Sequence, residues 1–221
     1  MARLKYSEDQ RDEILVKFIS ATREIIETEG VENVTVRKIA NIAGCNSAKL
    51  YFYFNDLDEL ITMASMSYLE KYTRTLVIDL QELDDNYEIF LHTWEVFCVY
   101  AFNNPVMFNQ IFFVYHETSL DDLIREYYRL FPYQLKNLDV RIQSMLLAGP
   151  LQVRNREILG FLVDDGVIKA DNIDLINELM VSYFFALLKD RILHGGGLIR
   201  MQKTKDKFMT GIKYLIDKER L

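Results

Sequence analysis

The chain begins with a pattern in which apolar side chains recur three and four positions apart, the spacing of a helix with one buried face. Ser7 and Gln10 form a capping box ahead of this pattern, and Gly30 follows it. The pattern therefore predicts a long first helix between Ser7 and Gly30. Its apolar face consists of Ile14, Leu15, Phe18, Ile19, Ile25 and Ile26.

Two short helices are predicted next. Thr35 is a good N-cap for the first of them, and Gly44 supplies the turn that ends it. Asn46 can cap the second, in which Leu50 and Phe54 lie four residues apart and face inward. A longer helix then runs to about residue 68. Two short helices around a glycine turn, with a longer helix on each side, predict a helix-turn-helix head.

The remaining sequence also predicts helices, because it keeps the helical spacing and the whole chain has only three prolines and nine glycines. Gly149 and Pro150 are expected to bend or break one helix. The predicted helices span residues 84–103, 106–115, 119–131, 138–164, 174–193 and 204–219. The predicted fold class is all-α, with an N-terminal three-helix head and a larger C-terminal helical body.

Composition narrows the class of protein further. Half of the residues are apolar, which is enough for a large core. The start, MARLKYSEDQ, lacks the apolar core of a signal peptide, and no run approaches the roughly 18 apolar residues of a membrane span. We therefore expect a cytoplasmic protein without a membrane partner. Cys45 and Cys98 lack the spacing of a zinc site, so both are interpreted as packing residues and no metal is expected.

The sequence does not indicate an enzyme. The histidines His92, His116 and His194 are scattered, and neither an HExxH nor a GxSxG motif occurs. The glycine run at 195–197 lacks the following Lys-Ser/Thr of a phosphate-binding loop. No catalytic residue and no cofactor are therefore expected.

The distribution of charge points to DNA. The net charge of −7 seems unfavourable for a nucleic-acid partner, since phosphate binding needs clustered Lys and Arg. However, no acidic residue occurs from Asn33 to Asn55, and this window contains Arg37, Lys38 and Lys49. It predicts a small DNA-binding surface on an otherwise acidic chain.

The residues of this window carry a family resemblance. The string TVRKIANIAGCNSAKLYFYFNDLDELI, from Thr35 to Ile61, closely resembles the signature of the TetR family of bacterial regulators. That signature has a Thr-x-Arg start, Ile-Ala, a glycine turn, and a Leu-Tyr-x-Tyr/His-Phe block that leads into a Glu-Leu helix. The match covers about residues 8 to 70. It implies a regulator of transcription that binds double-stranded operator DNA as a homodimer.

The resemblance also implies roles for single residues. Thr35 and Arg37 match the family's contacts at the start of the second helix, and Tyr51 and Tyr53 match its aromatic pair on the sugar-phosphate backbone. Leu57 stands where the family usually has a lysine, which puts one phosphate contact in doubt. The full set of predicted DNA-binding residues is Thr35, Arg37, Asn46, Ser47, Ala48, Lys49, Tyr51 and Tyr53.

A second interpretation applies to Tyr51 and to its neighbour Phe52. Each ring could instead belong to the core of the head, since a three-helix head must bury several aromatic side chains.

The domain limits predicted from the sequence are 1–55 for the DNA-binding domain, 56–80 for a connecting helix and 81–221 for a ligand-binding and dimerisation domain. The aromatic richness of residues 87–133 favours a small, largely apolar effector that releases the repressor from its palindromic operator. The expected ligand-binding residues are Trp94, Phe97, Phe108, Phe112, Tyr115, His116 and Tyr128. Two alternatives stay open: a body that binds a protein partner, and an activator in place of a repressor.

The last two predicted helices are expected to form the dimer interface. The helix over 174–193 has two apolar faces, of which one can cover its own domain while the other needs a partner. In this respect the pair resembles the helices that build the four-helix interface of the family. The expected dimerisation residues are Val181, Phe184, Phe185, Leu188, Ile192, Phe208 and Ile212.

Overall fold

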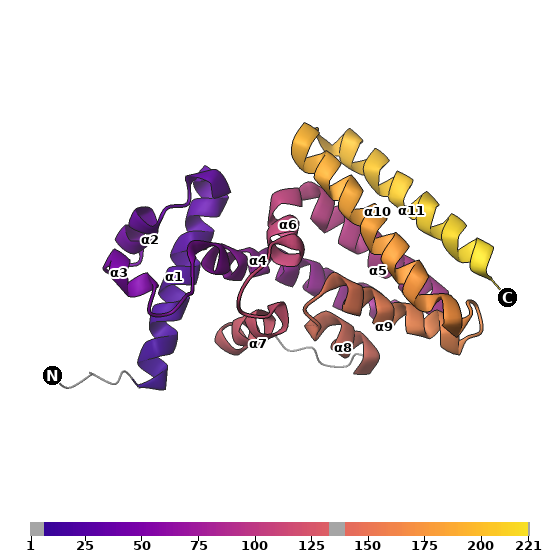
Figure 1. The fold of residues 1–221 in the computed structure, drawn as a ribbon, viewed down its shortest axis with the longest axis horizontal. Coiled ribbons are helices and arrows are strands. Elements are labelled where there is room, and N and C mark those ends of the chain that lie inside the picture. Colours follow the sequence, from indigo (N-terminus) through magenta and orange to yellow (C-terminus); the bar gives the residue numbers. More distant parts are fainter. Residues whose placement is uncertain (1–6, 133–139, 221) are drawn as a thin grey trace. The chain divides into compact units, whose positions relative to one another are not determined.

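A computed structural model describes residues 7–132 and 140–220, and within these ranges the chain is helical without a strand (Figure 1). The all-α class predicted from the sequence is confirmed. The helices are α1 (Glu8–Glu29), α2 (Val36–Ile42), α3 (Ser47–Leu50), α4 (Leu57–Asp79), α5 (Asn86–Asn103), α6 (Pro105–Phe113), α7 (Leu120–Leu130), α8 (Val140–Leu147), α9 (Leu151–Asp164), α10 (Ile173–His194) and α11 (Leu198–Glu219). Short 3₁₀ turns occur at Val31–Asn33, Leu80–Glu82 and Ala170–Asn172.

The chain divides into two compact units. The first contains the described residues of Met1–Met66 and Val114–Tyr133, and the second those of Ser67–Phe113 and Gln134–Leu221. α4 runs through the division, and α7 joins the first unit although its sequence lies far from the head. This division follows packing, whereas the limits 1–55, 56–80 and 81–221 concern function and stay a prediction.

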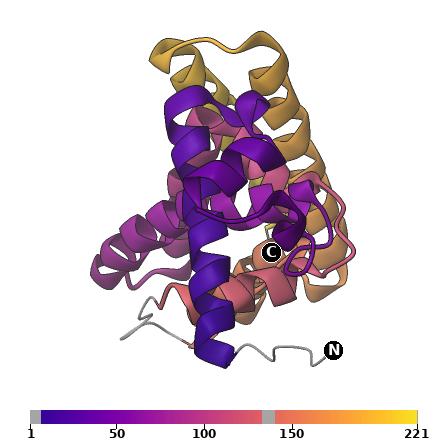
Figure 2. The same ribbon diagram turned by 90° about the vertical axis from the view of Figure 1, so that its left-hand side faces the viewer.

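The first unit is built on α1: α2 packs against α1, and α3 packs against α2 (Figure 2). The predicted capping box at Ser7 is present, with Gln10 N–H donating to the Ser7 hydroxyl and Ser7 N–H donating to the Gln10 side chain. Gly30 ends α1 at a φ of 91°, a value that favours glycine. The core of the unit includes the fully buried side chains of Phe18 and Leu50. These local elements are therefore the ones predicted from the sequence.

α7 is fixed to the first unit by a buried face and by an arginine. Its apolar face is buried at Leu123, Ile124 and Tyr127. Arg129 donates to both carboxylate oxygens of Asp12 on α1, with Nη2 lying 2.7 Å from Oδ1. Bidentate arginine–carboxylate pairs fix orientation as well as charge, so α7 has a defined position against α1.

The second unit packs α5 and α6 with α8–α11 around an aromatic core. Trp94 and Phe184 lie at its centre, with ring centroids 5.6 Å apart. A buried polar chain crosses this core: Trp94 Nε1–H donates to Asn155 Oδ1 at 2.8 Å, and Asn155 Nδ2 donates to Asn177 Oδ1 at 2.9 Å. A buried polar group is costly without such bonds, so the chain of bonds specifies how α5, α9 and α10 meet.

The structure divides one helix predicted from the sequence and moves the start of another. The helix expected over 138–164 is broken between α8 and α9 at Gly149-Pro150, while its expected start at Leu138 lies outside the described residues. α11 begins at Leu198, earlier than the predicted residue 204, because no breaker follows Gly197. Arg191 holds the preceding turn by donating to the carbonyl oxygens of Phe102, Gly195 and Gly196.

Candidate functional site

The candidate DNA-reading element is the pair α2 and α3, which are held in shape by local capping. Thr35 Oγ1 accepts a hydrogen bond from Lys38 N–H, and Asn46 Oδ1 accepts one from Ala48 N–H at 2.8 Å. Gly44 lies between the helices with a φ of 64°, and no other heavy atom would meet an added Cβ there. A residue with a side chain is strained in this backbone conformation, so the turn favours glycine on conformational grounds alone.

Most of the predicted DNA-binding residues lie on the surface of this element. The side chains of Thr35, Arg37, Asn46, Ala48 and Tyr51 are exposed, while Ser47, Lys49 and Tyr53 are half-buried. Tyr53 packs against Phe18, with ring centroids 6.3 Å apart. Tyr51 is 58% exposed and its neighbour Phe52 84% exposed, so neither ring belongs to the core.

The cations of the acid-free window differ in their availability. Lys38 is paired with Glu29 of α1 at 2.6 Å, so its charge is partly neutralised. Arg37 forms no hydrogen bond or ion pair with another described residue, and its side chain is exposed. The guanidinium of Arg37 is thus free to meet a phosphate.

Four of the predicted ligand-binding residues come together in the second unit. Phe97 is at the centre, with ring centroids 5.6 Å from Trp94, 5.4 Å from Phe108 and 5.7 Å from Phe112. The other three predicted residues do not join them. Tyr115, His116 and Tyr128 belong to the first unit.

Tyr115, His116 and Tyr128 lie away from the aromatic core because of the path of the chain. Tyr115 is 87% exposed, in the segment between α6 and α7. His116 Nε2 lies 2.8 Å from Thr62 Oγ1 on α4, and Tyr128 packs on its neighbour Tyr127. The chain returns to the first unit after Phe113, so residues 114–132 pack there instead of against the aromatic core.

A small cavity lies beside the aromatic core, lined by Tyr72, Trp94, Phe97, Arg154 and Asn155 among others. Its volume is about 20 Å³. That is room for about one water molecule, whereas small-molecule sites usually measure several hundred Å³. The effector site expected from the sequence would therefore require these helices to move apart.

The predicted dimerisation residues mostly face the interior of their own chain. Five of them are buried in the second unit: Val181, Phe184, Leu188, Phe208 and Ile212. Phe185 and Ile192 are half-buried, and Phe185 packs on Phe113 with ring centroids 4.4 Å apart. A different stripe of α10 is exposed, consisting of Leu175, Leu179, Ser182, Ala186 and Leu193.

The described residues show few features of a reactive cysteine, a metal site or a membrane span. Cys98 is fully buried, which raises the pKa of its thiol, and Cys45 is half-buried. Within residues 7–132 and 140–220, no group of His, Cys, Asp or Glu is arranged to hold a metal ion. No helix in these ranges is both long and apolar enough to cross a membrane.

The class of protein follows from these elements. A capped pair of short helices carries an exposed, acid-free face, and an all-helical body follows it, which together define a helix-turn-helix regulator architecture. Residues 18–62 match the family model of the bacterial regulatory proteins of the TetR family. The resemblance predicted from residues 35–61 is thereby confirmed, and the chain has the N-terminal domain of a TetR-family transcriptional regulator.

Solved structures share the fold along nearly the whole chain. RolR in complex with the ligand resorcinol superposes with a TM-score of 0.63 at 15% identity, over 95% of this chain and 90% of RolR. FadR of Thermus thermophilus in complex with lauroyl-CoA, a TetR-family repressor, gives 0.61 at 13% identity, over 91% and 92% of the two chains.

A third structure extends the same comparison. A putative TetR-family regulator from Syntrophomonas wolfei gives a TM-score of 0.58 at 14% identity, over 94% of this chain and 96% of that protein. No curated protein has a significantly similar sequence. At such low identities the likeness to the solved structures establishes the fold alone.

Proposed function

We propose that the protein is a cytoplasmic transcriptional repressor that binds a palindromic operator as a homodimer and is released by a small, largely apolar effector. The observation that carries this proposal is the exposed, acid-free surface of α2 and α3, within the residues that match the TetR family model. In this proposal residues 1–55 bind DNA, 56–80 connect the domains, and 81–221 bind the effector and dimerise.

The DNA-binding surface supports a division of labour among its residues. Arg37 and Tyr51 are exposed and suited to contact phosphates and sugars, which position the protein on the duplex. Ser47 and Lys49 lie on α3, the helix that enters the major groove in this class of protein, and are suited to contact base edges. Affinity should therefore fall steeply with salt, and sequence preference should depend on Lys49.

The dimer is supported by the exposed stripe of α10. Leu175, Leu179, Ser182, Ala186 and Leu193 fall within a narrow arc of the helix, because four, seven, eleven and eighteen residues are close to whole numbers of turns. Apolar side chains on a surface that also carries small residues suit the close approach of a second helix. The proposal thus places the two-fold contact on this outward stripe of α10.

The effector part of the proposal rests on the aromatic core of the second unit. Phe97, Phe108 and Phe112 offer an apolar wall, and the neighbouring Trp94–Asn155 bond offers a polar group that a ligand could share. RolR in complex with resorcinol and FadR in complex with lauroyl-CoA share this fold, which supports a ligand for this protein as well. Since the cavity now holds about 20 Å³, an effector must select a more open arrangement of the helices.

The DNA-binding proposal can be tested by selecting duplexes from a random library with the purified protein. A palindromic site should emerge, and Lys49→Ala should weaken its binding by about 1–3 kcal/mol while non-specific binding changes much less. Lys169→Ala, which removes an exposed lysine of the second unit, is the matched control and should bind as the unmodified protein does. Failure to enrich any sequence would contradict the proposal.

The effector proposal needs a separate test. Trp94 is the only tryptophan and is 2% exposed, so its emission should report a ligand that opens the core. Compounds that shift this emission and raise the melting temperature should also release the selected operator. If a broad screen finds no such compound, the alternative of a protein partner on the body takes the place of the effector.

A further inference from the structure

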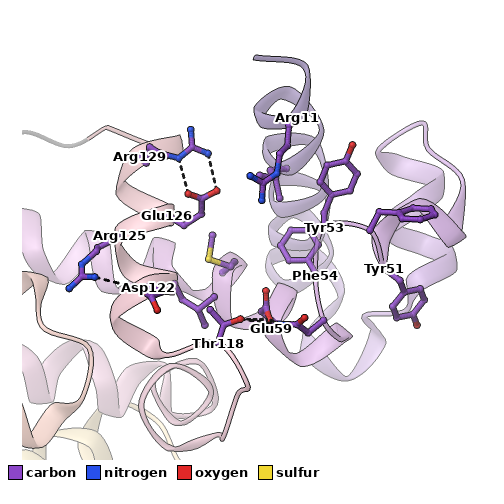
Figure 3. A pocket seen from close by; sticks show the side chains of 15 residues that line it. Arg11, Tyr51, Tyr53, Phe54, Glu59, Thr118, Asp122, Arg125, Glu126 and Arg129 are labelled. Carbon is purple, nitrogen blue, oxygen red and sulfur yellow. Dashed lines mark hydrogen bonds and ion pairs between the residues drawn. The ribbon is translucent and has the colours of Figure 1, made fainter. Parts of the chain in front are cut away.

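The first unit contains a cleft that the proposed function does not use. It has a volume of about 560 Å³ and lies between α1, the turn after α3, the start of α4, and α7 (Figure 3). Its inner surface includes Leu15, Phe54, Met63 and Leu123, each no more than 3% exposed. The volume lies within the range of small-molecule sites, and the lining combines these apolar side chains with charged ones.

A buried carboxylate faces this cleft. Glu59, the third residue of α4, lines the cleft and is only 7% exposed. Asn55 Nδ2 donates to it at 2.7 Å and Thr118 Oγ1 at 3.0 Å, and both bonds end on Oε2. Among the described residues no donor reaches Oε1, and that oxygen is still accessible to solvent.

Glu59 also lacks a cation among the described residues. The other acidic side chains of the cleft are already paired along α7, Asp122 with Arg125 at 3.3 Å and Glu126 with Arg129 at 2.7 Å (Figure 3). The pKa of Glu126 is lowered by its hydrogen bond from Arg129 and further by the charge of Arg11, which also lines the cleft. A buried carboxylate is expensive unless its oxygens are bonded or its charge is paired, so Oε1 is suited to accept from a cation.

The cleft also offers a surface for the rest of a ligand. Tyr53 and Phe52 line it from the turn after α3. Aromatic faces attract cations and pack against apolar groups. A carboxylate ligand would meet the negative charge of Glu59, and a hydrocarbon would leave Oε1 without a donor.

From this geometry we infer that the cleft binds a small protonated amine with an aromatic or aliphatic group. The ammonium would donate to Glu59 Oε1, and the apolar group would rest on Leu15, Met63 and Leu123. The site is distinct from the aromatic core of the second unit. Because Tyr51 and Tyr53 belong to its wall, an occupied cleft should alter operator affinity, and this last consequence rests on the proposed function.

The test uses three fluorinated probes of similar shape on the full chain without DNA: para-fluorophenethylamine, para-fluorophenethyl alcohol and para-fluorophenylacetate. Fluorine NMR line widths should show saturable binding of the amine, roughly tenfold weaker binding of the alcohol, and none of the carboxylate. The tenfold factor corresponds to the loss of one charge-assisted hydrogen bond. Glu59→Gln keeps the shape of the side chain and should abolish the preference for the amine.

The control variant is Glu24→Gln, which removes an exposed carboxylate of the first unit that does not line the cleft. It should bind the amine as the unmodified protein does, because Glu24 lies outside the proposed site. Equal binding of amine and alcohol, no binding at millimolar concentration, or an unchanged amine preference in Glu59→Gln would each overturn the inference. The comparison of probes on the unmodified chain does not depend on the folding of any variant, and a failure of operator binding would not affect it.

Discussion

The order of α3, the proposed recognition helix, should depend on one side chain, Asn46. α3 has only four residues, and its first N–H groups have no partner within the helix. Asn46 Oδ1 accepts from Ala48 N–H at 2.8 Å and so satisfies one of them. Replacing a capping residue by alanine costs about 1 kcal/mol, so Asn46→Ala should lower the free energy of unfolding by that amount. If α3 must be ordered to bind, operator affinity should fall by up to about fivefold, the limit being reached when α3 is mostly unfolded in the free variant.

Asn46→Ser is the matched control, because a serine hydroxyl also caps well but cannot reach as far toward DNA. Urea unfolding without DNA measures the stability, and fluorescence anisotropy with a selected operator measures the affinity. The reasoning predicts that serine preserves both properties and alanine lowers both. Equal stability of the serine and alanine variants would refute the capping argument. A loss of affinity in both variants without a loss of stability would instead show that the Asn46 amide contacts the operator.

Three further predictions concern the two units. Phe184→Ala removes a fully buried ring that packs on several aromatic neighbours, so urea unfolding should show a loss of about 3–5 kcal/mol. Leu179→Glu places a charge on the outward stripe of α10, and light scattering should find monomers with unchanged helix content, whereas a persistent dimer would exclude this stripe as the interface. Arg129 lowers the pKa of its two carboxylate partners, so their contribution to stability is present above the ordinary carboxyl pKa and is lost as pH falls through the lowered values. Arg129→Gln should therefore be less stable at neutral pH and lose less stability between about pH 5 and pH 2 than the unmodified protein.

The elements predicted well from the sequence are those set by neighbouring residues. The caps at Ser7, Thr35 and Asn46 and the break at Gly149-Pro150 need only a few adjacent side chains and the local backbone. For the same reason, the exposed face of α2 and α3 follows directly from the sequence pattern.

Some groups of residues predicted from the sequence do not come together in the structure, because their positions depend on the path of the whole chain. Aromatic content alone suggested one ligand wall, but the chain leaves the aromatic core after Phe113, so His116 and Tyr128 pack in the other unit. On α10 the pattern shows two apolar faces, but not which of them the same chain covers. Phe184 packs on aromatic rings of α5 and α11, and Leu188 is also buried, which leaves the stripe with Leu179 outside. Neither arrangement is encoded within a window of a few residues.

The return of α7 to the first unit has a consequence for engineering chimeric regulators. A contiguous graft of residues 1–66 would carry the proposed recognition helix but would lose Arg129, which pairs with Asp12 of α1, and the buried apolar face of α7. A donor head joined to a foreign body would then expose Leu15 and Met63, side chains that are now buried. Operator specificity in this architecture is therefore transferable only as a two-segment transplant, in which residues 114–132 travel together with the head.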